Sequence, residues 1–151
     1  MSQRLRITSG YMSLVGGVLG FGLMLWLLFQ TGRIEPAIAF TFALGSSLFA
    51  LGIYAGAAAL RQSGNWLLPN FVFWLLQVPL FASPVISYYS SAALGTWLYA
   101  SSEPRIGWSF YLGSQLQLSV GQGPAEIVAG INVIAAILAV ATGRAAWQSD
   151  A

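Results

Sequence analysis

Two amides near the middle of long apolar segments are the side chains of this sequence best suited to form a site. Gln77 lies two residues before Pro79, and Asn132 lies within the last apolar run. A polar side chain inside a membrane is costly unless it is paired, so such residues are the first candidates for a function. They predict either a structural hydrogen bond or a site for a small solute or ion. A proline frees the carbonyl about four residues before it, so the Gln77 amide is placed to bond the carbonyl of Leu75.

Catalysis is the function class that the composition disfavours most. The sequence holds no Cys, no His and no Lys. The commonest general base, the commonest metal ligand and two of the usual nucleophiles are therefore missing. We expect no enzymatic activity, no catalytic residue, no metal site and no cofactor.

A second candidate group is charged and flanks the apolar runs. We expect its members on one face of a membrane, where simple surface pairing is the plainest interpretation: Arg33, Glu35, Glu103, Arg105 and Glu126. Glu126 follows Pro124 in a typical helix start. A carboxylate there faces the positive end of the helix dipole, which predicts a structural role for it.

The elements that must position these residues are predicted to be transmembrane helices. Of the 151 residues, 57% are hydrophobic and 7% are charged, whereas a soluble domain carries about 25% charged residues. Apolar runs of about the 20 residues that a bilayer requires cover 9–30, 37–60, 66–87 and 124–146. The sequence thus predicts an all-α membrane protein, a four-helix transmembrane bundle forming one domain.

The segment between the third and fourth runs, residues 88–123, departs from the helical pattern. From 108 to 120 apolar residues alternate with polar or small ones, as in an amphipathic strand. Its expected partner is 93–100, which makes a small extracytoplasmic β-ribbon between helices three and four. We favour one continuous strand over a hairpin at Gly113-Ser114. Its expected buried face holds Trp108, Phe110, Leu112, Leu116 and Leu118.

Small residues within the apolar runs predict where helices approach closely, because helices in a bilayer associate through such positions. The first two runs carry pairs in GxxxG spacing, and the fourth carries a stripe that includes Asn132. This packing is either within the bundle or between subunits. The expected packing residues are Gly16, Gly20, Gly52, Gly56, Ala129, Ala136 and Gly143.

Arginine counting gives the expected orientation. With four spans both termini lie on one side, together with Arg4, Arg6, Arg61 and Arg144, whereas Arg33 and Arg105 lie on the other. The excess places both termini in the cytoplasm, and we expect a bacterial inner (plasma) membrane. The arginines are too scattered for a nucleic-acid interface, so the expected partners are the lipid bilayer and a second copy or another membrane protein.

Three function classes remain open. The first is a structural, accessory or self-associating subunit, which the small-residue faces and a ribbon in need of a partner favour. The second is a channel or transporter for a small solute, with its site near Gln77 and Asn132. The third is a membrane module that binds a lipid or an extracellular factor through the aromatic segment between the third and fourth runs. A continuous polar path through the bundle would separate the second class from the first.

Overall fold

The computed structural model describes residues 3–31, 35–62, 65–103, 105–121 and 123–149. Within them the chain forms four helices and six strands. The helices are α1 (Gln3–Gln30), α2 (Pro36–Leu60), α3 (Leu67–Leu75) and α4 (Val133–Ser149). The strands are β1 (Pro79–Ala82), β2 (Ile86–Ser91), β3 (Leu94–Ser101), β4 (Ile106–Leu112), β5 (Gln115–Val120) and β6 (Val128–Asn132).

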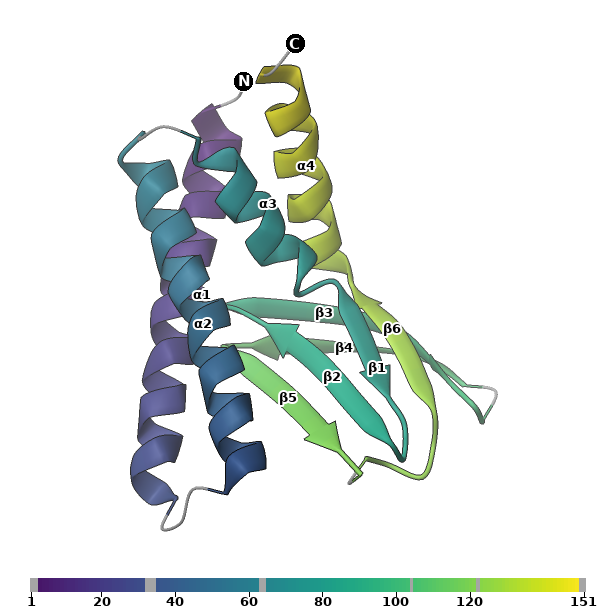
Figure 1. The fold of residues 1–151 in the computed structure, drawn as a ribbon. Coiled ribbons are helices and arrows are strands. Elements are labelled where there is room, and N and C mark those ends of the chain that lie inside the picture. The colour runs from purple at the N-terminus through teal and green to yellow at the C-terminus, as the bar shows by residue number, and fades with distance from the viewer. Residues whose placement is uncertain (1–2, 32–34, 63–64, 104, 122, 150–151) are drawn as a thin grey trace.

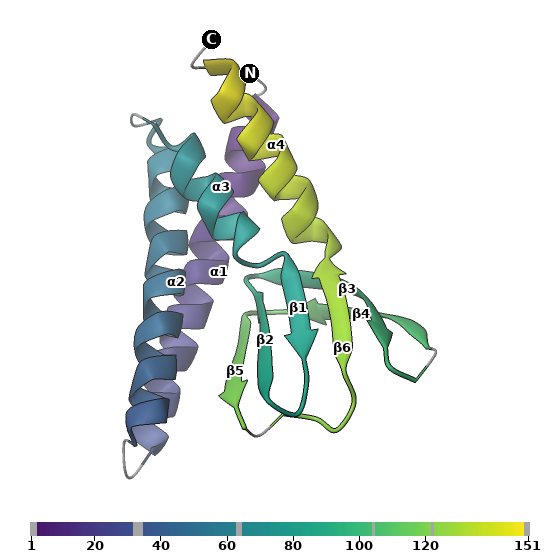
Figure 2. The same cartoon turned by 45° about the vertical axis from the view of Figure 1, so that its right-hand side comes forward.

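Helices α1 and α2 form a long antiparallel pair along one side of the molecule (Figure 1). The shorter helices α3 and α4 pack beside the half of this pair where α1 begins and α2 ends. The sheet lies beside the other half (Figure 2). Among the described residues only 3–30 and 38–60 form helices long and apolar enough to cross a membrane.

The predicted all-α four-helix bundle is therefore wrong. The run 66–87 contains α3, then β1 and the first residues of β2, and the run 124–146 contains β6 followed by much of α4. Helix α3 ends at Leu75, four residues before Pro79, because the proline ring would clash with the carbonyl of Leu75 in a continuing helix. A strand joined to a helix gives the same unbroken apolar run as one long helix, so hydropathy alone did not separate them.

The six strands form one antiparallel sheet in the order β4-β3-β6-β1-β2-β5. Strands β2, β3, β4 and β5 form a single long two-stranded ribbon. Its register pairs Ile86 with Val120 at one end and continues unchanged to the pair of Ala100 and Ile106 at the other. The expected ribbon is thus part of a larger sheet. Strands β4 and β5 do not pair with each other, so Gly113-Ser114 is a bend in one path and not a hairpin turn.

The ribbon bends where Ala93 and Gly113 lie opposite each other. Both have positive φ angles, 64° and 122°, and the N–H of Gly113 donates to the carbonyl of Ala93. The bend turns the β3–β4 half of the ribbon away from the β2–β5 half. Strands β1 and β6 then fill the space between the two halves, which produces a curled sheet rather than a flat one.

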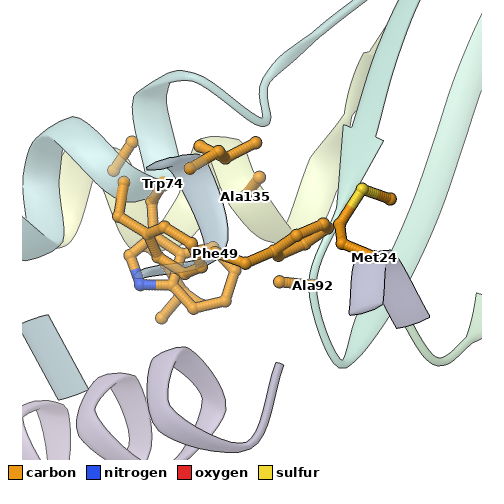
Figure 3. Packing of buried hydrophobic residues seen from close by; sticks show 9 residues of the cluster. Met24, Phe49, Trp74, Ala92 and Ala135 are labelled. Atoms are coloured by element: carbon orange, nitrogen blue, oxygen red, sulfur yellow. The ribbon is translucent and has the colours of Figure 1, made fainter. Parts of the chain in front are cut away.

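A compact apolar core joins the helices to the bend. Phe49 from α2 and Phe73 and Trp74 from α3 are fully buried, and the two α3 rings meet edge to face at 5.2 Å. Figure 3 shows these rings close to Ala92 at the bend and to Met24 of α1. The core therefore fixes the sheet against both long helices.

Candidate functional site

The two candidate amides lie together where the helices meet the sheet. Both Gln77 and Asn132 are fully buried. Gln77 follows the end of α3, Asn132 ends β6, and the N–H of Asn132 donates to the carbonyl of Val78 at 2.8 Å. No hydrogen bond between the two side chains is found among the described residues.

Within the described residues, each amide side chain forms hydrogen bonds through only one of its two polar atoms. Gln77 Nε2 donates to the carbonyl of Phe73 at 3.0 Å, whereas the expected acceptor, the carbonyl of Leu75, is bonded by the N–H of Val78. Asn132 Oδ1 accepts from the N–H groups of Thr96 and Ala135, each at 3.3 Å. Gln77 Oε1 and Asn132 Nδ2 form no hydrogen bond with any residue that the structure describes.

Asn132 has a structural task that the sequence analysis missed. Its side-chain oxygen bonds the N–H three residues later, as an N-cap does, and α4 begins at the next residue. Asparagine is among the preferred N-cap residues, so its place before Val133 was the available signal. The same oxygen bonds β3, and Asn132 therefore ties the start of α4 to the sheet.

The inner, concave face of the sheet is polar. Side chains alternate between faces along each strand, so the registers assign Tyr89, Trp97 and Asn132 to one face. The rings of Tyr89 and Trp97 lie 6.1 Å apart although β1 and β6 separate their strands. A flat sheet would hold them about 14 Å apart, at ~4.8 Å per strand spacing, so this face is concave.

Several buried hydroxyls on and near the concave face lack partners. Ser87 and Ser119 oppose each other in the β2–β5 ladder, and Ser91 lies on the same face. The oxygens of all three are buried and make no hydrogen bond among the described residues. Buried polar groups normally find a partner, often an ordered water, so this face offers hydrogen bonds that the chain itself leaves unused.

The outer face of the sheet is apolar, and its β4 part is open. The side chains that we expected to be buried are instead among the most exposed: Trp108 is 73% exposed, Phe110 57% and Leu112 76%. Leu116 and Leu118 are partly buried beside α2. The expectation is therefore wrong for the three residues of β4 and only partly met by the two of β5.

A buried polar network at the helical end escaped the sequence analysis. Asn70 of α3 accepts a hydrogen bond from the Ser13 hydroxyl at 2.8 Å and donates to the carbonyls of Ala55 at 2.8 Å and Trp66 at 3.1 Å. Asn70 thereby links α1, α2 and its own helix. Its position four residues after Trp66, near the start of an apolar run, gave only a weak signal.

The predicted charged group is only partly assembled. Glu103 and Arg105 form an exposed ion pair at 3.3 Å. Glu35 precedes α2 and Glu126 precedes β6, both exposed, and neither forms an ion pair within the described part of the chain. Arg33 lies outside the described residues. Glu126 does not start a helix, because a strand follows it.

The predicted packing glycines of α1 and α2 contact either another helix or the bend of the sheet. A side chain at Gly20 would meet the ring of Phe49, and one at Gly56 the backbone of Leu14, so α1 and α2 pack directly at these positions. A side chain at Gly52 would strike Phe73. Gly16 instead contacts the bend of the sheet, because its carbonyl accepts a hydrogen bond from Ser114 Oγ at 2.8 Å.

The small-residue stripe of the fourth run is split by the fold. Ala129 lies in β6, opposite Ala100 of β3, and therefore faces no helix. Ala136 and Gly143 lie in α4, where a side chain added at Gly143 would meet the ring of Phe71 at 2.9 Å. The stripe thus packs against α3 only in its second half.

The groups gathered at the helix–sheet junction are hydroxyls and amides. No cluster of three or more His, Cys, Asp or Glu that suits a metal occurs among the described residues. Hydroxyls and amides bind water or neutral polar molecules through hydrogen bonds. Comparison with protein-family models, curated proteins and solved structures finds no match for this chain.

Proposed function

We propose that this protein is an integral membrane subunit that assembles with copies of itself through the edge strand β4. The observation that carries the proposal is an open, apolar edge strand beside two helices long enough to cross a bilayer. The proposal keeps the self-associating subunit as the first function class and gives it a specific surface.

Contacts with α1 support a position of the sheet inside the bilayer. Helix α1 has 28 residues, or about 42 Å at ~1.5 Å per residue, against a hydrocarbon thickness of about 30 Å. Gly16 lies at its middle and bonds Ser114 at the bend of the sheet. If α1 spans the membrane, the bend lies near mid-bilayer and the sheet occupies the half toward the α1–α2 turn.

The distribution of side chains on the sheet fits this depth. Spanning barrels place apolar side chains outward toward lipid and polar ones inward. Here Leu98, Trp108 and Phe110 are exposed on the outer face, while Ser87 and Asn132 are buried on the inner face. On this proposal the runs 66–87 and 124–146 still enter the membrane, each as part helix and part strand.

Orientation remains part of the proposal. The end where α1 begins and α4 ends carries Arg4, Arg6, Arg61 and Arg144 (Figure 1). The acidic residues of the described chain, Glu35, Glu103 and Glu126, precede α2 or flank the strands. The positive-inside rule then favours cytoplasmic termini in a plasma membrane of the bacterial inner-membrane type.

Strand β4 has backbone groups that the described chain leaves unpaired. Two hydrogen bonds show which residues of β4 direct their backbone groups toward β3. The Ser101 N–H donates to the Arg105 carbonyl, and the Gly113 N–H donates to the Ala93 carbonyl. Alternate residues then point their N–H and C=O groups away from β3. These are Ile106, Trp108, Phe110 and Leu112. Lipid cannot satisfy such groups, and each costs several kcal/mol in hydrocarbon, whereas another strand satisfies them.

The sequence of β4 suits pairing with itself. An antiparallel pair centred on Ser109 places Trp108 opposite Phe110, and Ile106 opposite Leu112, of the second copy. Aromatic pairs and aliphatic pairs across strands are favourable, and the outward N–H and C=O groups face one another in this register. Strand β4 runs across the direction of α1 and α2 (Figure 1), as self-pairing about an axis parallel to those helices requires.

Disulfide cross-linking tests the proposal, since the chain has no cysteine of its own. Ser109→Cys places two thiols in a pair with Cα atoms about 4.5 Å apart, within the range of a disulfide. Oxidation of membranes should give a band at twice the 16.1 kDa of the chain. Ser47→Cys, exposed on α2, is the matched control and should stay monomeric. No dimer from Ser109→Cys, or equal dimer from both variants, would refute the self-pairing.

A second candidate, binding of a small neutral polar solute, is supported by the partnerless hydroxyls of Ser87, Ser91 and Ser119. A channel is less favoured, because the apolar core that contains Phe49, Phe73 and Trp74 fills the junction between the helices and the bend of the sheet. In a screen by thermal unfolding, a neutral solute that stabilises the wild type but not Ser87→Ala would support this candidate. Stabilisation of both proteins alike would count against it.

A further inference from the structure

A groove with a volume of about 850 Å3 lies between α3 and α4. Its walls are Leu68 and Phe71 of α3 and Val140 of α4. Its floor consists of small residues, Ala139, Gly143 and Ala146. The two lining side chains with polar groups, Arg144 and Trp147, lie toward the C-terminal end of α4.

The charge around this groove is one-sided. The Arg144 guanidinium is exposed and forms no ion pair or hydrogen bond within the described part of the chain. Arg4, Arg6 and Arg61 lie at the same end of the molecule, and no described residue there is acidic. Of these, Arg6 already donates to the carbonyl of Ala59 at 3.2 Å, and Arg61 caps α2.

We infer that this groove binds one anionic phospholipid of the leaflet on the side of the termini, with an acyl chain between α3 and α4 and the headgroup phosphate on Arg144. The inference rests on the proposed membrane position. Residues 139–147 of α4 rise by about 12 Å, at ~1.5 Å per residue, comparable with much of one leaflet of a ~30 Å hydrocarbon core.

The chemistry of each end of the groove matches one part of such a lipid. Aliphatic and aromatic walls suit an acyl chain. A guanidinium binds a phosphate through paired N–H donors, and Trp147, 83% exposed, lies at the level where tryptophan prefers the membrane interface. A zwitterionic lipid offers the same chains but adds a cation that the Arg144 guanidinium disfavours, so the site should select by headgroup.

Native mass spectrometry of the protein released from nanodiscs of equal phosphatidylglycerol and phosphatidylcholine tests the site. The wild type should retain phosphatidylglycerol preferentially. Arg144→Gln should reduce that retention about fivefold, the equivalent of ~1 kcal/mol per basic residue near an anionic surface. Arg61→Gln removes the same charge at the same end outside the groove and should change retention little. Equal losses in both variants would mean general surface charge and would overturn the site.

A second pair of variants tests the acyl part. Val140→Trp fills the groove from an exposed wall and should abolish retention of the lipid, whereas Ile137→Trp, exposed on α4 outside the groove, should not. Retention unaffected by Val140→Trp would overturn the inference. Its failure is distinct from failure of the membrane proposal, since a protein that alkaline carbonate releases from membranes would contradict the latter.

Discussion

Replacement of Asn70 by alanine removes the side chain that links three helices. Asn70 is fully buried, and so is the Ser13 hydroxyl that donates to it at 2.8 Å. The truncation leaves that hydroxyl without its acceptor and frees the carbonyls of Ala55 and Trp66 from a second donor. A buried polar group left unsatisfied costs about 1–3 kcal/mol.

The magnitude follows from two opposing effects. Ser13 is helical and can turn its hydroxyl to a carbonyl of its own preceding turn, which lowers the cost of losing Asn70. Interhelical hydrogen bonds in membrane proteins average only ~0.6 kcal/mol, because the polar groups also find partners in the unfolded chain within the membrane. With the cavity left by the amide included, we expect Asn70→Ala to lower the free energy of unfolding by about 2 kcal/mol. Ser13→Ala should lower it by about 1 kcal/mol.

A double-mutant cycle measured by reversible unfolding in mixed micelles isolates the pair. The coupling energy between Ser13→Ala and Asn70→Ala should be about 0.5–1.5 kcal/mol. Asn65→Ala, an exposed amide before the same helix, is the matched control and should change stability by less than about 0.5 kcal/mol. Additive effects of the two buried substitutions would refute the assignment of Asn70 as the link between α1 and α3.

Three further predictions follow from single contacts. Gly17→Leu should prevent folding or lower the free energy of unfolding by more than about 3 kcal/mol, because its side chain would meet the α2 backbone at Ile53 and Phe49. Gly22→Leu is the control and should be neutral or stabilising, because nothing lies within 4 Å of its Cβ position. Protein yield and thermal unfolding in detergent measure both effects. Asn132→Ala should cost about 1 kcal/mol by the same assay and expose the first amides of α4 to hydrogen exchange, whereas unchanged exchange would contradict the N-cap. Phe110→Ser should leave the unfolding free energy of the protomer within about 0.5 kcal/mol, because the ring is 57% exposed, yet reduce the dimer fraction in sedimentation; an unaltered fraction would count against the β4 interface.

The two long helices could be predicted from the sequence, because their signal is hydropathy over a length that no strand reaches. Residues 9–30 and 37–60 lie within α1 and α2. The ladder between 93–100 and the strand at 106–112 was also accessible, because period-2 alternation is local. The outer position of Trp108 and Phe110 was not, since it depends on what surrounds the sheet.

The rest of the fold depends on pairing between distant segments. Val128 to Asn132 has the small, apolar character of a membrane helix, and only its place between β3 and β1 makes it a strand. Pro79 follows the end of α3 and Asn132 directly precedes α4, so both residues carry a local signal for a helix end or start. No local pattern revealed that Asn70 would link three helices.

The central claim is that the sheet lies within the bilayer with its apolar face outward, and cysteine accessibility tests it most directly. Leu112→Cys, on the exposed outer face near the bend, is compared with Ser102→Cys beyond the end of β3. In sealed membranes a water-soluble maleimide should label Ser102→Cys and leave Leu112→Cys unmodified until detergent or denaturant exposes it. Rapid labelling of Leu112→Cys in intact membranes would place the sheet in water and contradict the proposal.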